Sequence, residues 1–128
     1  MHKIMIVDDY VDLTHVMKIF LKGEGYEVEE CAKAEDVFKK IYAFSPDLII
    51  LDVYLDGESG RSLCMKIKSL TSTKNIPVIL YSAHNFPPDY LEGCNNDDFI
   101  QKPFELSELK KKIEFHLAMR DKVSKSAE

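Results

Sequence analysis

Short apolar runs alternate along the chain with longer segments in which apolar residues recur at helical spacing. Continuous apolar runs lie at residues 4–7, 48–51, 76–81 and 99–100, and residues 26–31 form a more polar, alternating run. Short apolar runs flanked by turn residues are typical of parallel strands buried on both faces, and an alternating run is typical of an edge strand. The pattern therefore predicts five strands.

The segments that follow most of these runs have the spacing of amphipathic helices. Apolar residues at this spacing occur in four segments, residues 13–21, 37–42, 63–70 and 106–117. Residues 83–96 are the exception, because Pro87 and Pro88 disfavour a helix interior there. The alternation predicts a doubly wound α/β sandwich with right-handed crossovers, in which the fourth helix is shortened to a turn or two.

Composition limits the class of protein further. A chain of 128 residues, with 45% hydrophobic and 30% charged residues, suits one globular domain. The formal net charge of −5 gives no electrostatic footprint for nucleic acid, and no apolar run approaches the roughly 18 residues that cross a bilayer. The cysteines are scattered, which argues for a reducing compartment and against disulfides or structural zinc; they are Cys31, Cys64 and Cys94. We therefore expect a small cytoplasmic domain without direct contacts to nucleic acid or membrane.

Acidic, hydroxyl and basic side chains stand just past four of the predicted strands. Asp8 and Asp9 follow the first strand, and Asp52 follows the third. Ser82 follows the fourth strand and Lys102 follows the fifth. In doubly wound sheets, ligands bind outside the carboxyl ends of the strands, at the topological switch point. We therefore expect these side chains to form one site.

The charges of this group favour a metal ion and a phosphoryl group. Neighbouring carboxylates repel one another unless a cation lies among them, and Mg²⁺, a hard ion with oxygen ligands, suits such a site. The Lys102 ammonium would face a visiting anion, and a phosphoryl group would also accept a hydrogen bond from Ser82. Asp52 stands alone after the central strand, with Gly57 and Gly60 in the loop behind it. It is therefore the candidate acceptor that would form an aspartyl-phosphate.

Over residues 1–119 the sequence resembles a response-regulator receiver domain, the phosphoacceptor module of two-component signalling, in the form of a single receiver of the chemotaxis-regulator type. The resemblance rests on the strand-end residues described above, on the alanine after Ser82 and on Pro103 and Phe104 after Lys102. It implies a five-stranded parallel sheet of flavodoxin-like order 2-1-3-4-5 and a cis bond at Lys102–Pro103. Residues 120–128 are left as a polar tail or linker.

The resemblance also implies a role for each residue of the site. Asp52 would be the phosphoacceptor, assisted by Lys102 and Ser82. Ser82 and Phe99 would couple phosphorylation to a conformational switch. The Mg²⁺ ligands that it implies are Asp8 through a coordinated water, Asp9 and Asp52 directly, and the backbone carbonyl of Tyr54.

Some positions depart from the family pattern. Asp56 stands where a proline is usual, and Asn95 and Asn96 replace the usual Gly-Ala pair before the fifth strand. Tyr54 and His84 occupy the two variable positions that, in the family, tune how long the phosphoryl group lasts. Both side chains are large enough to shield the acceptor from water, which predicts slow self-dephosphorylation.

The implied phosphoryl donor is a histidine kinase or a histidine phosphotransfer protein, and the downstream target stays open. We expect a monomer or a homodimer formed on phosphorylation, with Phe86, Tyr90 and Leu91 as an apolar contact. The resemblance implies a signalling domain with at most autophosphorylation and autodephosphorylation activity, not an enzyme that turns over a substrate.

Three alternatives stay open. One is a receiver excised from a larger response regulator or hybrid histidine kinase. A second is a small Mg²⁺-dependent phosphatase with an aspartyl nucleophile, which commonly has a second acid two residues beyond the nucleophile, where Tyr54 stands. A third is a nucleotide- or flavin-binding module, which needs a phosphate-cradling loop after the first strand, whereas residues 8–12 are acidic.

Overall fold

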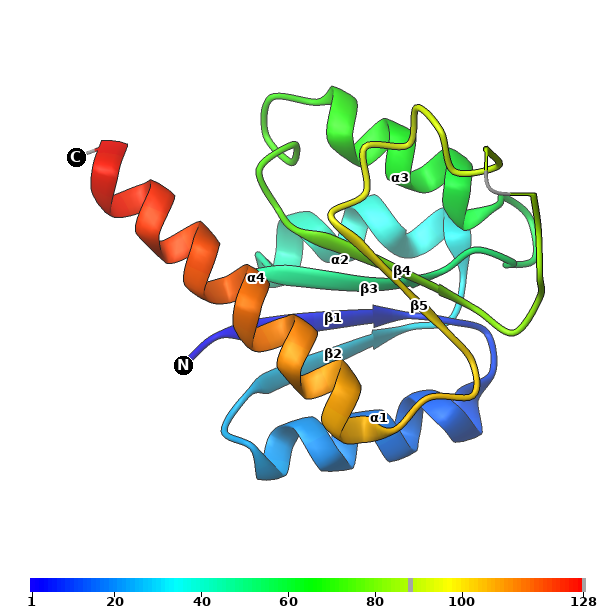
Figure 1. Cartoon of the computed structure of the whole chain (residues 1–128), viewed down its shortest axis with the longest axis horizontal. Coiled ribbons are helices and arrows are strands. Elements are labelled where there is room, and N and C mark those ends of the chain that lie inside the picture. The colour runs from blue at the N-terminus through cyan, green and yellow to red at the C-terminus, as the bar shows by residue number, and fades with distance from the viewer. Residues whose placement is uncertain (88, 128) are drawn as a thin grey trace.

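The computed structural model describes residues 1–87 and 89–127, and the side chains of these residues through position 123. Five parallel strands form one sheet in the order β2-β1-β3-β4-β5 (Figure 1). The strands are β1 (Lys3–Val7), β2 (Glu27–Cys31), β3 (Leu48–Asp52), β4 (Val78–Ser82) and β5 (Asp98–Gln101). The predicted direction and order of the strands are confirmed.

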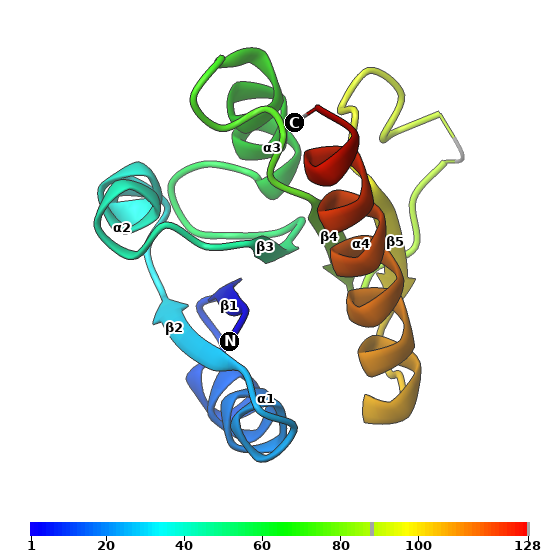
Figure 2. The ribbon, with the colours of Figure 1, turned by 90° about the vertical axis from the view of Figure 1, so that its left-hand side faces the viewer.

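Helices cover both faces of this sheet. The described residues form α1 (Val11–Gly23), the short 3₁₀ helix η1 (Ala34–Asp36), α2 (Val37–Phe44), α3 (Gly60–Ser69) and α4 (Leu106–Ala127). The helices α1 and α4 pack on one face, and α2 and α3 pack on the other (Figure 2). This is the doubly wound arrangement that the alternation predicts. None of the described helices is long and apolar enough to span a membrane.

Each central strand sends alternate side chains into two apolar cores, because helices cover both faces of the sheet. In β1, Met5 packs towards α2 and α3, whereas Ile4 and Ile6 pack towards α1 and α4. All three side chains are fully buried. A polar residue on either face of such a strand would therefore lie inside a core, which explains the continuous apolar runs. Polar side chains become possible only where a strand reaches its carboxyl end.

The connection between β4 and β5 departs from the regular alternation of strand and helix. Its described residues form turns, in which the amides of Tyr90, Glu92 and Cys94 donate to the carbonyl oxygens three residues earlier. The predicted shortening of the fourth helix is confirmed and goes further than expected, since turns replace the helix. A proline lacks the N–H that a helix interior needs. Pro88, one of the two prolines behind this prediction, lies outside the described residues.

The last helix, α4, continues beyond the expected end of the domain. Residues 120–127, which the sequence pattern assigns to a polar tail, are the final turns of this helix. Arg120 Nη1 donates to Asp47 Oδ1 at 2.5 Å, and His2 Nε2 lies 3.0 Å from Asp121 Oδ2. These contacts tie α4 to the residues that precede β3 and β1. A domain boundary at residue 119 stays a prediction.

Gly60 begins α3 where this helix crosses the end of β3. Its amide donates to the Val53 carbonyl at 2.8 Å, and a Cβ built on it would lie 1.9 Å from the backbone oxygen of Asp52. We expect Gly60→Ala to lower the free energy of unfolding by about 2 kcal/mol or more, because backbone atoms must move. Urea denaturation measures the change. Gly23→Ala is the matched control, since its Cβ would meet nothing within 4 Å, and equal stability of the two variants would contradict the prediction.

Candidate functional site

The carboxyl ends of four strands bring the candidate site residues to one edge of the sheet. Asp8 and Asp9 follow β1, and Asp52 is the last residue of β3. Ser82 is the last residue of β4, and Lys102 follows β5. One carboxylate oxygen from each of Asp8, Asp9 and Asp52 lies within 4.8 Å of the other two. The structure therefore brings together the residues that the sequence pattern groups at this edge.

The Lys102 ammonium lies between two buried carboxylates. Its Nζ donates to Asp8 Oδ2 at 3.0 Å and to Asp52 Oδ2 at 3.2 Å. The side chains of Lys102, Asp8 and Asp52 are 15%, 0% and 10% exposed, so solvent ions screen these contacts little. One positive charge faces two negative ones, and the site therefore favours a further cation. The Lys102–Pro103 bond is cis, as the resemblance implies.

The pKa values of the two carboxyl groups shift in opposite directions, although burial opposes the charged form of both. Burial raises the pKa of Asp52 to about 6, and the neighbouring charge of Asp8 adds to the rise. Burial also opposes charge on Asp8, yet hydrogen bonds, first among them the one from Tyr81, hold the pKa of Asp8 below its ordinary value. At neutral pH both groups are therefore carboxylates, and the site is anionic even with Lys102 in place.

Backbone amides of the following loops orient these carboxylates. The Tyr10 amide donates to Asp8 Oδ1 at 2.9 Å, and the Tyr54 amide donates to Asp52 Oδ1 at 3.1 Å. In both cases an aspartate side chain accepts from the backbone two residues on, which is the usual way that Asp begins a turn. The Oδ2 atoms are left to face the ammonium group.

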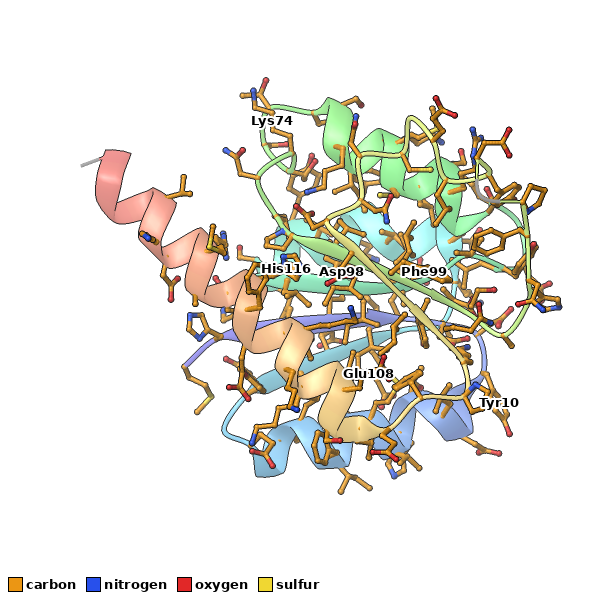
Figure 3. All side chains as sticks on the ribbon, viewed as in Figure 1. Tyr10, Lys74, Asp98, Phe99, Glu108 and His116 are labelled. Atoms are coloured by element: carbon orange, nitrogen blue, oxygen red, sulfur yellow. The ribbon has the colours of Figure 1, made fainter. Side chains whose placement is uncertain are left out.

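Asp9 is the exposed member of the acidic group. Its Oδ2 accepts the Asp56 amide at 3.3 Å, which links the loops that follow β1 and β3. Asp56, the residue that replaces the usual proline, thus approaches the acidic group through its backbone. Tyr10, which directly follows Asp9 in the chain, lies at this edge of the sheet (Figure 3).

Ser82 and Phe99, the candidate switch residues, have different surroundings. Ser82 is buried, and its Oγ accepts the His84 amide at 3.0 Å. Phe99 lies in β5 (Figure 3), and its ring packs edge-on against Phe86 with centroids 5.4 Å apart. The ring centroids of Phe86 and Tyr90 lie 5.0 Å apart. Phe99 therefore forms an aromatic cluster with these two residues of the β4–β5 connection. The switch role of the pair stays a prediction.

The rings of Tyr54 and His84 pack against each other. Their centroids lie 4.4 Å apart with an angle of 54° between the ring planes. Tyr54 comes two residues after Asp52, and His84 comes two residues after Ser82. The pair therefore joins the loops that follow β3 and β4.

Tyr81 is a contact of the site that the sequence pattern does not reveal. It is fully buried in β4, and its hydroxyl donates to Asp8 Oδ2 at 2.5 Å. Burial raises the pKa of this phenol far above its ordinary value, so the hydroxyl stays a donor. In the sequence, Tyr81 is the last residue of the apolar run at residues 76–81, which predicts a strand and assigns this side chain no role in the site. The one available signal is a second hydroxyl group directly before Ser82 at the carboxyl end of a strand.

The family model of the response regulator receiver domain matches residues 4–114 of the chain. The chain therefore belongs to the response regulator receiver family, a signalling domain of two-component systems, as the resemblance implies.

Known proteins of this family resemble the chain in sequence and structure. It is 30% identical over 113 residues to the phosphate regulon transcriptional regulatory protein PhoB of Rhizobium meliloti, an alignment that covers 87% of this chain and 50% of that protein. A CheY-like response regulator receiver domain protein from Methanospirillum hungatei is 27% identical, with a TM-score of 0.88 over 95% of this chain and 98% of that one. The response regulator TrrA from Thermotoga maritima, in complex with Mg(2+)-BeF, is 30% identical, with a TM-score of 0.81 over 91% of this chain and 99% of that one. The chain spans about half the length of the curated relatives it matches.

Proposed function

We propose that Asp52 accepts a phosphoryl group and that its phosphorylation switches the conformation and partner binding of the domain. The observation that carries this proposal is the grouping of Asp8, Asp9 and Asp52 with the Lys102 ammonium at the carboxyl ends of the strands. An acceptor carboxylate needs neighbouring positive charge before an anionic phosphoryl group can approach it. The ammonium supplies one such charge, and the surplus of carboxylates would recruit another.

The residues present fit Mg²⁺. The three carboxylates offer the oxygen ligands that this hard ion prefers, and their oxygen atoms already lie within 4.8 Å of one another. Asp9, Asp52 and the backbone carbonyl of Tyr54 would hold the ion directly, and Asp8 would hold it through a water. When bound, the ion would neutralise charge on the phosphoryl oxygens. The complex of the relative TrrA with Mg(2+)-BeF supports this choice of ion.

Side chains of the chain itself supply the other parts of the reaction. A carboxylate oxygen of Asp52 attacks the phosphorus atom, the new O–P bond forms as the bond to the donor breaks, and the donor leaves with that electron pair. Because the pKa of Asp52 is about 6, the group is present as the required carboxylate at neutral pH. The Lys102 ammonium then pairs with the transferred phosphoryl oxygens, and the Ser82 hydroxyl donates a hydrogen bond to them.

The phosphoryl donor in this proposal is a histidine kinase or a histidine phosphotransfer protein. The chain matches half of a transcriptional regulatory protein, so a receiver within a longer regulator stays beside the single-domain regulator as an alternative. Phe86, Tyr90 and Leu91 pack against the core shared with α2 and α3 and are partly buried. A phosphorylation-dependent homodimer through these residues stays a prediction.

Acetyl phosphate and the intact mass of the protein test the proposal. With Mg²⁺, the chain should gain one phosphoryl group. Asp52→Asn, and wild type with EDTA, should gain none. A gain that persists in Asp52→Asn would place the acceptor elsewhere and overturn the proposal. The absence of both a mass gain and Mg²⁺ binding in the folded wild type would also overturn it.

Tyr54 and His84 are expected to slow the loss of the phosphoryl group, because their rings, which pack together, would shield the acceptor from an attacking water. The double variant Tyr54→Ala/His84→Ala should shorten the half-life of the phosphoryl group about tenfold, equivalent to ~1.4 kcal/mol of barrier. The decay of the phosphorylated mass after removal of acetyl phosphate gives the half-life. Tyr42→Ala, at an exposed position on α2, is the control. A wild-type half-life of seconds at neutral pH would contradict this expectation.

A further inference from the structure

Tyr81 contacts both the acidic group and the lysine of the site. Its hydroxyl donates to Asp8 Oδ2 at 2.5 Å, the same oxygen that accepts Lys102 Nζ at 3.0 Å. The Lys102 ammonium also lies over the Tyr81 ring, 4.2 Å from the centroid. The Tyr81 ring also has an apolar neighbour: it packs edge-on against Phe104, with the ring centroids 6.1 Å apart. One rigid side chain thus touches both charged groups, and it is itself held in the core.

We propose that Tyr81 is a positioning residue of the site, which fixes the Asp8 carboxylate for the metal ion and lets Lys102 divide its hydrogen bonds between Asp8 and Asp52. The inference rests on the proposed function, because it assigns Tyr81 a part in the same Mg²⁺ site. Packing alone does not account for the hydroxyl, since a phenylalanine would fill the same place in the core. The Asp8 side chain is 0% exposed, so bulk water cannot replace the Tyr81 hydroxyl as a hydrogen-bond donor.

The loss of the hydroxyl would change how the ammonium is shared. At present the donors to Asp8 Oδ2 are Tyr81 and Lys102, while Lys102 also reaches Asp52 Oδ2 at 3.2 Å. Without the Tyr81 hydroxyl, the ammonium must satisfy the buried Asp8 oxygen by itself. Lys102 would then move towards Asp8, where it competes with a divalent cation, and away from the acceptor. Removal of the hydroxyl should therefore weaken Mg²⁺ binding even though it adds no charge to the site.

Titration calorimetry with Mg²⁺, without any phosphodonor, tests the inference on three proteins. We expect the dissociation constant for Mg²⁺ to rise about 10-fold in Tyr81→Phe, the lower end of the effect of removing a group that orients a metal ligand. Tyr42→Phe is the matched control, because its hydroxyl also has a side-chain partner, Ser72 Oγ at 3.0 Å, but lies on α2. It should bind Mg²⁺ as wild type does. Urea denaturation in EDTA shows whether each variant is folded.

The outcomes separate the role of Tyr81 from the proposed function. A folded Tyr81→Phe variant whose Mg²⁺ affinity equals or exceeds that of wild type would overturn the inference, even if its stability fell, since a purely structural hydroxyl affects stability alone. If wild type binds Mg²⁺ but takes no phosphoryl group at Asp52, the proposed function fails, and the calorimetric comparison still decides the role of Tyr81. If wild type binds no Mg²⁺, the proposed function and this inference both fail.

Discussion

Lys102→Met is expected to slow the phosphorylation of Asp52 by acetyl phosphate about 100-fold or more, the cost of removing one preorganised group that stabilises developing charge. In the resting site, the Lys102 ammonium lies 3.2 Å from Asp52 Oδ2, where it can reach the oxygens of an incoming phosphoryl group. Methionine keeps the length of the side chain but lacks the charge. The rate of mass gain at saturating Mg²⁺ measures the effect.

The same substitution should leave Mg²⁺ affinity unchanged or increase it, because the ammonium that shares Asp8 and Asp52 with the metal ion is gone. This combination, slow transfer with intact metal binding, distinguishes a lost charge from a collapsed site. Lys112→Met is the matched control, since Lys112 pairs with Asp98 at the start of β5. A Lys102→Met rate within a few-fold of wild type would show that transfer does not depend on the ammonium.

Parallel sheet geometry explains why so much of the site could be predicted. All strands run in one direction, so the residue after each apolar run lies at the same edge, whatever its distance along the chain. Asp8, Asp52 and Lys102 are far apart in sequence, yet each stands at such a position. The continuous apolar runs also fix the fold, because they leave only the strand ends for charged side chains.

The parts that could not be predicted depend on contacts between distant residues. Tyr81 ends an apolar run in β4, and only the fold of the sheet brings its hydroxyl to Asp8, which follows β1 on the far side of β3. The polar end of α4 resembles a tail in the sequence, but Asp47 and Arg120 hold it as helix against the start of β3. In the β4–β5 connection, prolines predict a break in the helix but not the turns that replace it. The spacing of residues in the sequence predicts periodicity within one helix or strand, but it does not predict contacts between residues of different elements.

Asp52→Asn should change the pH dependence of stability as well as remove the acceptor. Burial raises the pKa of Asp52 from its ordinary value of 3.8 to about 6. Between these two pH values the folded metal-free protein holds a proton that the unfolded chain has released. Its free energy of unfolding therefore falls, by up to about 3 kcal/mol from this group, as pH rises through the interval. Above pH 6 the full penalty of a buried charge beside Asp8 is present.

Asparagine cannot ionise, so Asp52→Asn should gain stability relative to wild type as pH rises from 4 to 8. Urea denaturation of both proteins in EDTA across this range measures the difference in the free energy of unfolding. Asp8 is present in both proteins and contributes far less to that difference, because hydrogen bonds hold its pKa below the ordinary value. A difference that stays flat with pH would contradict the burial of an ionised Asp52. Added Mg²⁺ should reverse the order above pH 6, because the charge that destabilises metal-free wild type is then a ligand that the variant lacks. The carboxylate that costs the resting fold stability is thus the group that the metal ion and the phosphoryl group require.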